Sequence, residues 1–331
     1  MGSIDNATSV SVVIPTTLRK SITKTISSLL KQKESEKILI EIVVNPIATN
    51  DKLLKKLQRN KRISVRFHPE EYSTAEQSAF HAAATSESDW VWIIGDDDLA
   101  EEGSIEHIIH LVENYEVDFW LLNCRLDFAG VPLKYYEIGP EKIQIARSFD
   151  VWKKLGFLTT LTTLSCFLIR RDVIDLETFE EFHDIQGIYS HSFSMLAMLK
   201  DSLVGVTDMA CVNRNEQGSK EIGESLQRYT EATGRQLDSL WIEGVVALGE
   251  KLSKLTNIPF YRLMEYREIE IIKDPNNSYT SQVGLKFLIS STREVAFQRL
   301  LSRSEINSSL ETTLGPSNPG LVFSGPIRIT I

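Results

Sequence analysis

The first 125 residues alternate between short β-branched runs and segments whose apolar residues recur at helical spacing. Strands separated by helices are expected at residues 11–15, 40–44, 63–67, 90–94 and 118–123. Such alternation is typical of βαβ units and predicts an α/β fold with a mainly parallel sheet. Ligands of such sheets bind beyond the carboxyl ends of the strands, so four loops should meet at one edge, those after Pro15, Val44, Phe67 and Ile94.

The pattern loosens after residue 125 and becomes mostly helical after residue 219. The apolar residues favour a strand at 165–169, a helix at 188–200, short β segments at 204–206 and 210–213, and further helices around 240–248, 263–272 and 285–301. We therefore predict an α/β domain over residues 1–219 and a helical C-terminal region over residues 220–331.

Composition excludes several classes of protein. The chain has 36 Lys and Arg against 45 Asp and Glu, a net charge of −9, which argues against a general nucleic-acid binder. The three cysteines (Cys124, Cys166 and Cys211) form no CxxC pair, so buried reduced thiols are expected rather than a zinc site. The sequence shows neither a signal peptide nor an apolar run of membrane-spanning length, so we expect a cytoplasmic protein whose membrane contact, if any, is peripheral.

Three consecutive carboxylates, Asp96, Asp97 and Asp98, follow the apolar run Trp90–Ile94 after a single glycine, Gly95. These charges repel one another at the end of a buried strand, and a divalent cation would make the arrangement favourable. Mg²⁺ and Mn²⁺ use one or two carboxylates together with substrate phosphates. The alternative is a solvated acidic turn that caps the following helix. The position after the fourth strand of an alternating pattern favours the metal site.

Three segments together resemble family 2 glycosyltransferases of the GT-A fold, a Rossmann-like sheet flanked by helices. They are SVVIPTTLRKSITKTISSLLKQ, EIVVNPIATND and STAEQSAFHAAATSESDWVWIIGDDDLAEEGSIEHI. The likeness is nearest to bacterial surface-polysaccharide enzymes of the abequosyltransferase type, which also carry GDDD. It implies an inverting transfer from a nucleoside-diphosphate sugar to a saccharide or a lipid-linked oligosaccharide. It also implies Mn²⁺ or Mg²⁺, with possible peripheral contact at the inner face of the membrane.

The resemblance also implies the residues that bind the nucleotide sugar. The first-strand loop supplies Pro15, Thr16 and Thr17, with Arg19 just beyond, and the remaining candidates are Asn45, Gln77, Asp96 and Arg214. An N-cap role for Thr17 and a surface position for Arg214 are the alternatives. The chain departs from the family at three places. Asn45-Pro46 replaces a pair of aspartates, Glu76-Gln77 replaces an Arg-Asn pair, and Gly95 replaces the first aspartate of the metal motif.

On this register Asp97 is the best metal ligand, and Asp96 contacts the ribose or a metal-bound water. Asp98 is either the second metal ligand or orients the loop, because a shift of one residue exchanges these roles. Arg214 lies in the segment VNRNEQGS, which resembles a Tyr-Arg-x-His segment of the family, and its planar cation would neutralise the departing diphosphate.

Inverting transfer also needs a general base on the acceptor hydroxyl. The family uses an Asp within a Glu-Asp pair, which the corresponding helix of this chain does not contain. His191 occupies that place, and a histidine near its ordinary pKa suits the task at neutral pH. Asp184 is the alternative base, with His191 then binding or packing, and His183 is a weaker candidate. The C-terminal helical region would complete the acceptor side or form an oligomer contact. A nucleotidyltransferase and a catalytically degenerate nucleotide-sugar-binding scaffold are the competing functions.

Overall fold

A computed structural model describes residues 8–48, 50–72, 74–128, 131–134, 137–138, 142–187, 189–214, 237–258 and 328–329. The N-terminal elements are β1 Val10–Thr16, α1 Ile22–Leu30, η1 Ser35–Lys37, β2 Leu39–Val44, α2 Asp51–Gln58, β3 Ile63–Phe67, α3 Ala75–Ala84, β4 Trp90–Ile93, β5 Leu99–Ala100 and α4 Ser104–Asn114. The later elements are β6 Phe119–Phe128, β7 Val131–Lys134, β8 Glu137–Ile138, β9 Ile143–Arg147, α5 Ser148–Leu155, α6 Phe157–Thr160, η2 Leu164–Cys166, β10 Phe167–Arg170, η3 Arg171–Val173, α7 Leu176–His183, α8 Ser190–Met198, β11 Leu203–Arg214, α10 Leu237–Thr256 and β12 Arg328–Ile329.

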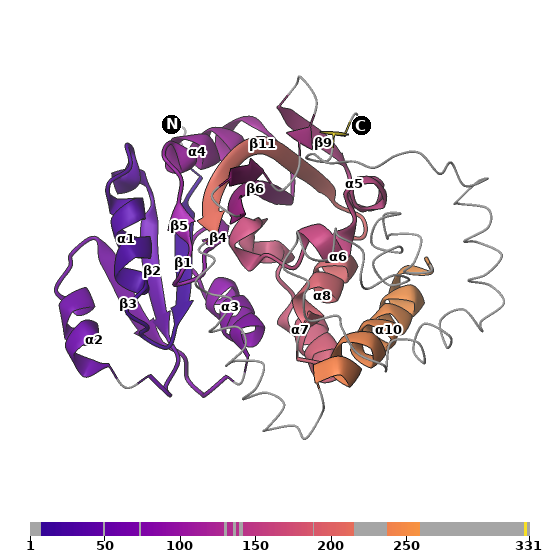
Figure 1. Ribbon diagram of the computed structural model, residues 1–331, viewed down its shortest axis with the longest axis horizontal. Coiled ribbons are helices and arrows are strands. Elements are labelled where there is room, and N and C mark those ends of the chain that lie inside the picture. Colours follow the sequence, from indigo (N-terminus) through magenta and orange to yellow (C-terminus); the bar gives the residue numbers. More distant parts are fainter. Residues whose placement is uncertain are drawn as a thin grey trace, which may run out of the picture.

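The main sheet has the strand order β3-β2-β1-β4-β10-β6-β11-β5 (Figure 1). Strands β3, β2, β1 and β4 are parallel, as the alternating sequence pattern predicts. Strand β10 then runs antiparallel to both β4 and β6, and β11 is parallel to β6. The sheet is therefore parallel in its N-terminal part and mixed beyond β4, and the α/β fold class is confirmed.

The predicted meeting of loops at one edge of the sheet is also confirmed. The Asn45 amide donates to the Thr16 carbonyl at 2.9 Å, and the His68 amide donates to the Val44 carbonyl at 3.0 Å. Local capping sets where the adjoining helices begin. The side chain of Asn50 accepts from the Leu53 amide at the start of α2, and Thr74 caps α3. Helix α3 therefore begins at the same edge, directly after the β3 loop.

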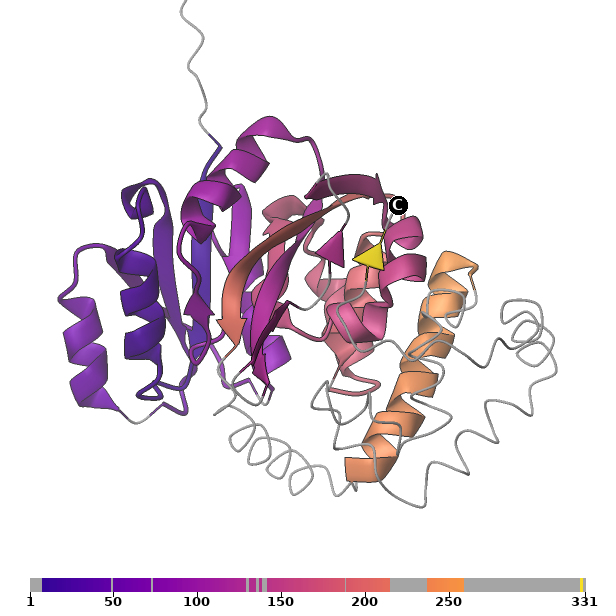
Figure 2. The same cartoon turned by 45° about the horizontal axis from the view of Figure 1, so that its top comes forward.

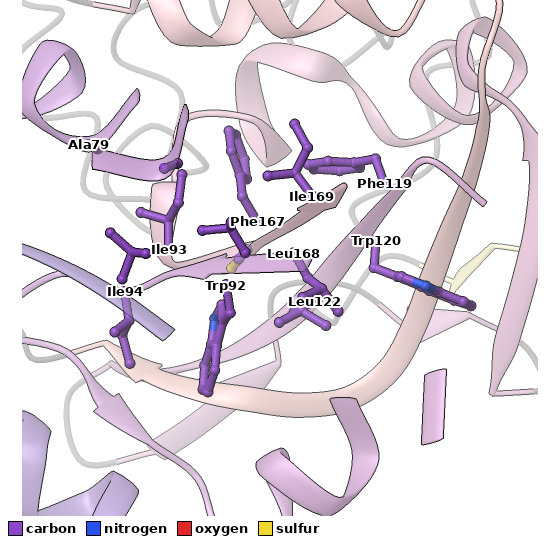
Figure 3. Close-up of a cluster of buried hydrophobic side chains, with 14 of the residues drawn as sticks. Ala79, Trp92, Ile93, Ile94, Phe119, Trp120, Leu122, Phe167, Leu168 and Ile169 are labelled. Atoms are coloured by element: carbon purple, nitrogen blue, oxygen red, sulfur yellow. The ribbon is translucent and has the colours of Figure 1, made fainter. Parts of the chain in front are cut away.

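The core lies on both faces of the central strands. Side chains alternate along each strand, so Phe119 and Phe167 point to one face while Trp92 points to the other (Figure 3). The first face is covered by α3, α7 and α8, and the second by α1 and α4 (Figures 1 and 2). The ring of Phe167 lies 6.3 Å from that of His191 in α8, and the ring of Trp120 lies 5.5 Å from that of Tyr115, directly after α4. The sheet and its two helical layers thus form a continuous buried core.

Strand β11 is longer than the sequence pattern predicts. The two short β segments expected at 204–206 and 210–213 belong to one strand, interrupted by register shifts between Val206 and Ala210 and between Ala210 and Val212. Gly205 lies flat on the Trp120 ring, because a Cβ at this position would come within 2.3 Å of ring carbons. The strand curves across the molecule (Figure 2) and carries Arg214 to the carboxyl edge.

The C-terminal region is described only over α10 and the short β12. Helix α10 buries Leu248 and Leu252 fully, and Lys251 pairs with Glu181 of α7 and lies 5.5 Å from the centre of the Phe182 ring. Strand β12 pairs in parallel with β8. The helices expected at 263–272 and 285–301 lie outside the described residues, and the boundary at residue 219 stays a prediction.

Two sequence expectations concern the chain as a whole. All three cysteines are free and buried, as expected. Among the helices that the structure describes, none combines the length and the apolar character needed to cross a lipid bilayer.

Candidate functional site

The acidic loop lies at the carboxyl end of β4, beside the loop that follows β1. The Ile94 amide donates to the Val13 carbonyl at 3.1 Å, which carries the β1–β4 pairing up to the loop. The Asp98 amide then donates to the Gly95 carbonyl at 3.2 Å, closing a tight turn. This turn presents three carboxylates to the edge at which parallel sheets bind ligands.

Asp96 is buried and binds the β1 loop. Its side chain is 2% exposed, its Oδ2 accepts from the Thr16 hydroxyl at 2.5 Å, and its Oδ1 pairs with Arg19. Burial raises the pKa of the Asp96 carboxyl, and the Arg19 and Thr16 contacts oppose that rise. Thr16 also accepts from the Leu18 amide at 2.8 Å, and Leu18 has a positive φ of 62°. Asp96 therefore holds the first-strand loop in its bent shape.

Asp97 and Asp98 meet over Gly95. An ideal Cβ at Gly95 would lie 3.0 Å from Asp97 Oδ1, 3.3 Å from Asp98 Oδ2 and 3.4 Å from the Ser165 hydroxyl. Glycine thus leaves a small space bordered by two carboxylate oxygens and a hydroxyl. Ser165 Oγ accepts from the Gly95 amide at 2.9 Å and donates to Asp98 Oδ2 at 2.5 Å. Hard oxygen donors of this kind fit Mg²⁺ or Mn²⁺.

Arg214 lies on the side of the site opposite Arg19. It is the last residue of β11, and its Nη1 donates to the Thr163 hydroxyl at 3.4 Å. Thr163 begins the short segment that leads through Ser165 into β10, so Arg214 and Asp98 hold the same segment. Asn213, next to Arg214, pairs with Leu99, next to Asp98, in the β11–β5 ladder. The structure therefore brings the predicted cation to the acidic loop.

Two other predicted donor-binding residues take part in contacts within the protein. Asn45 donates through its side-chain amide to the Tyr72 carbonyl at 2.9 Å and accepts from the Ile47 amide at 3.3 Å. Gln77 donates to both carboxylate oxygens of Glu180 at 3.2 Å. Thr17 is exposed, and its alternative role as an N-cap is wrong because Ser21 is the N-cap of α1. Pro15 is half-buried in the same loop. The donor-binding roles of these residues stay predictions.

His191 lies in the first turn of α8 and faces α3. Its side chain is 3% exposed, and its Nδ1 lies 3.8 Å from Glu76 Oε1. Burial lowers the pKa of His191 to about 4, although the backbone of Thr162 and Leu161 opposes the shift. Glu76, in the first turn of α3, is 17% exposed, and burial raises its pKa to about 7. The imidazole is thus neutral at physiological pH and almost closed off from solvent.

Asp184 caps the C-terminal end of α7 and is exposed. Its carboxylate, that of Glu180 and a ring nitrogen of His183 come within 4.8 Å of one another. Glu180 pairs with His81 of α3, and His183 Nε2 lies 3.1 Å from the Thr74 hydroxyl. These contacts join the C-terminal end of α7 to the first turns of α3. The weaker candidate His183 therefore lies in a structural network between two helices.

Sequence reasoning missed Glu76, Thr163 and Ser165. In the sequence, Glu76 stands where the family has a cation and therefore predicts no catalytic role. Thr163 and Ser165 precede a strand without forming a motif, so only the three-dimensional contacts reveal them. A signal for Glu76 does exist, since it is an acid in the first turn after the Thr74 cap and its helix starts at the ligand-binding edge.

Comparisons with solved structures agree with the fold. The solved structure of S. aureus TarS 1-349 with UDP superposes with a TM-score of 0.52 and 14% identity, covering 96% of this chain and 95% of that one. The same protein with UDP-GlcNAc gives a TM-score of 0.51 and 14% identity, covering 92% and 91%. At this identity the likeness concerns the fold alone. A search of curated protein sequences gives no significant match.

A family comparison decides the classification. The family model described as "Glycosyl transferase family 2" matches residues 11–176, half of the chain. This span begins in β1, includes the acidic loop and ends at the first residue of α7. The chain belongs to glycosyl transferase family 2, and its activity is glycosyl transfer.

Proposed function

We propose that the protein is a metal-dependent, inverting glycosyltransferase that moves a sugar from a nucleoside diphosphate to a hydroxyl of a saccharide or lipid-linked oligosaccharide. The observation that carries this proposal is the convergence of Asp97, Asp98 and Ser165 over Gly95, with Arg214 held nearby on Thr163. Carboxylates beside an arginine suit a cation-bridged diphosphate, because the positive charges offset the anionic donor.

Residues on two sides of the acidic loop support donor binding. The exposed Thr17 and half-buried Pro15 border the site at the carboxyl end of β1, and Arg19 contacts Asp96 and lies 3.4 Å from Asp97 through Nη1. UDP and UDP-GlcNAc are bound in the TarS structures of similar fold, so they are the first donor probes for this chain. The Asn45 amide, engaged with Tyr72 and Ile47, would shape the base-binding loop from behind.

Asp97 and Asp98 would hold the divalent cation, which on binding supplies positive charge to the two phosphates of the donor. Asp96 would orient the loop through Thr16 and Arg19. Arg214 would neutralise the nucleoside diphosphate as it departs. Because an inverting displacement passes through one in-line step, the acceptor hydroxyl must lie on the face of the sugar opposite the diphosphate.

Calorimetric titration with UDP, with and without Mn²⁺, tests the donor and metal assignments. The wild type should bind UDP more tightly when Mn²⁺ is present. Asp97→Ala should abolish this metal-dependent gain while the far-ultraviolet circular dichroism remains that of the wild type. Asp201→Ala removes an exposed carboxylate next to the start of β11, at the opposite edge of the sheet, and should bind as the wild type does. Unchanged metal-dependent binding in Asp97→Ala would show that the metal assignment is wrong.

A further inference from the structure

The first turns of α3 and α8 bring two ionisable side chains together beside the proposed donor site. We propose that Glu76 is the general base that takes the proton from the acceptor hydroxyl, an assignment that rests on the proposed function. His191 is then a positioning residue that holds the Glu76 carboxylate from the protein interior. The family motif and the sequence favoured His191 or Asp184 for the base, so the geometry points to a different residue on a different helix.

Contact and exposure distinguish the roles of the two side chains. His191 Nδ1 lies 3.8 Å from Glu76 Oε1, which makes the pair neighbours in space although they are far apart in sequence. The Glu76 side chain is 17% exposed, whereas that of His191 is 3% exposed. A general base must come within hydrogen-bond reach of the proton that it removes. Of these two residues, only Glu76 offers solvent-accessible surface to an acceptor.

The pair is connected to the acidic loop by a short stretch of chain. The backbone of Leu161 and Thr162 lies against the His191 ring, and the same stretch continues to Ser165, which binds Asp98. The chain from Leu161 to Ser165 spans at most about 14 Å when fully extended. The His191 ring, which contacts the start of this stretch, therefore lies no farther from Ser165 than about that length plus one contact distance. Thr163, within this stretch, also accepts from Arg214. One segment, residues 161–165, therefore contacts His191, Arg214 and Asp98.

The ionisation of the pair suits proton transfer. Burial raises the pKa of Glu76 to about 7, and the backbone of Glu76 and Tyr189 opposes the rise. A base works best when its pKa lies near the working pH. The neutral His191 imidazole adds no positive charge, so it positions the carboxylate without lowering its pKa strongly. On α7, Glu180 contacts Gln77 and His81 of α3, and His183 contacts Thr74, the N-cap of α3. These α7 groups therefore contact residues close to Glu76 in the chain.

The proposed step balances as follows. A Glu76 carboxylate oxygen accepts the proton of the acceptor hydroxyl while the oxygen of that hydroxyl forms a bond to the anomeric carbon. The bond between the anomeric carbon and the β-phosphate oxygen breaks, and its electron pair leaves with the nucleoside diphosphate beside Arg214. Protonated Glu76 then releases its proton to solvent through its exposed edge. No further reactant is required.

Steady-state release of UDP from UDP-GlcNAc with Mn²⁺ tests the assignment, with water as acceptor and other nucleoside-diphosphate sugars tried in parallel. Glu76→Gln should lower kcat by about 10²–10⁴-fold, the usual contribution of a general base. Its affinity for UDP, measured by calorimetry, should stay within about threefold of that of the wild type. Glu76→Asp should retain an intermediate kcat. Glu113→Gln, the same change at an exposed position on α4, should behave as the wild type does.

The pH profile separates proton transfer from a structural effect. In the wild type, kcat/KM should rise with pH through a pKa of about 7, because the base acts when deprotonated and kcat/KM reports the ionisation of the free enzyme. His191→Phe should move this acid limb to higher pH and recover near-normal kcat above it, because an apolar ring disfavours the charged carboxylate. His191→Gln, which keeps a polar side chain beside Glu76, should keep the limb near its wild-type position. A uniform loss of kcat at every pH in His191→Phe would overturn the positioning role.

Three outcomes decide between the assignments. If the wild type turns over a donor and Glu76→Gln does so with a near-normal kcat, the assignment of Glu76 is overturned. If Asp184→Asn instead shows the loss of kcat expected here for Glu76→Gln, about 10²–10⁴-fold, the general base is Asp184 of α7. Absence of turnover by the wild type with every donor would overturn the proposed function, and the assignment of Glu76 would fall with it. Calorimetric binding of UDP by Glu76→Gln guards against a fold defect as the cause of lost turnover.

Discussion

The Glu76 carboxyl should make the protein less stable as pH rises, and Glu76→Gln should remove that dependence. Its pKa in the fold is about 7, against an ordinary value of 4.5. The folded state therefore holds this proton more tightly than the unfolded chain does. The resulting stabilisation is fully present below pH 4.5 and is lost as pH rises through about 7.

The size of the effect follows from the two pKa values. Each pKa unit corresponds to about 1.4 kcal/mol, so a rise from 4.5 to about 7 costs about 3 kcal/mol once Glu76 is fully ionised. Between about pH 5 and pH 8 the wild type should lose about 2–3 kcal/mol relative to Glu76→Gln. With a urea m-value of about 2 kcal/mol/M, the difference between their midpoints should grow by about 1 M.

Urea unfolding followed by circular dichroism measures this difference at several pH values. Comparing each variant with the wild type at the same pH cancels the titration of other groups, including the buried His68 and the partly buried His107, whose pKa values burial lowers to about 4. Glu113→Gln makes the same change at an exposed position of α4 and controls for the substitution itself. If the difference between Glu76→Gln and the wild type stays constant from pH 5 to pH 8, Glu76 is not a buried carboxyl with a raised pKa.

Two further predictions concern stability alone. Gly205→Ala should lower the free energy of unfolding by about 1–3 kcal/mol or more, because its Cβ would enter the Trp120 ring, and an unchanged urea midpoint would contradict the packing described for β11. Thr16→Val should cost about 1–3 kcal/mol, because it removes the hydroxyl that joins Asp96 to the Leu18 amide. The exposed Thr17→Val should leave the urea midpoint in place, and equal midpoints for both threonine variants would refute the role of Thr16.

Local signals predicted the N-terminal part of the fold well. The β3 strand has the expected bounds, Ile63–Phe67, and Asn50 and Thr74 cap the helices that follow β2 and β3, respectively. These features depend on residues a few positions apart, which a sequence displays directly. The reversed direction of β10 depends instead on its pairing with β4 and β6, and that pairing joins residues far apart in the chain.

The candidate site divides in the same way. The acidic loop was predictable because a strand and its following residues are contiguous, and Arg214 was predictable from a segment resembling the family. The contact between Glu76 and His191 was not, because it depends on two helix starts meeting at one edge of the sheet. Burial then disfavours the charged form of both groups, lowering the pKa of the imidazole and raising that of the carboxyl.

Donor turnover by the wild-type protein is the most direct test of the central claim that this chain transfers a sugar from a nucleoside diphosphate. The measurement is release of free nucleoside diphosphate from a panel of nucleotide sugars, starting with UDP-GlcNAc, with Mn²⁺ and with a chelator. We predict slow release from at least one donor that stops when the metal is chelated and in Asp97→Ala. Tight binding of a donor without its turnover, with or without metal, would contradict the account and indicate a nucleotide-sugar-binding protein.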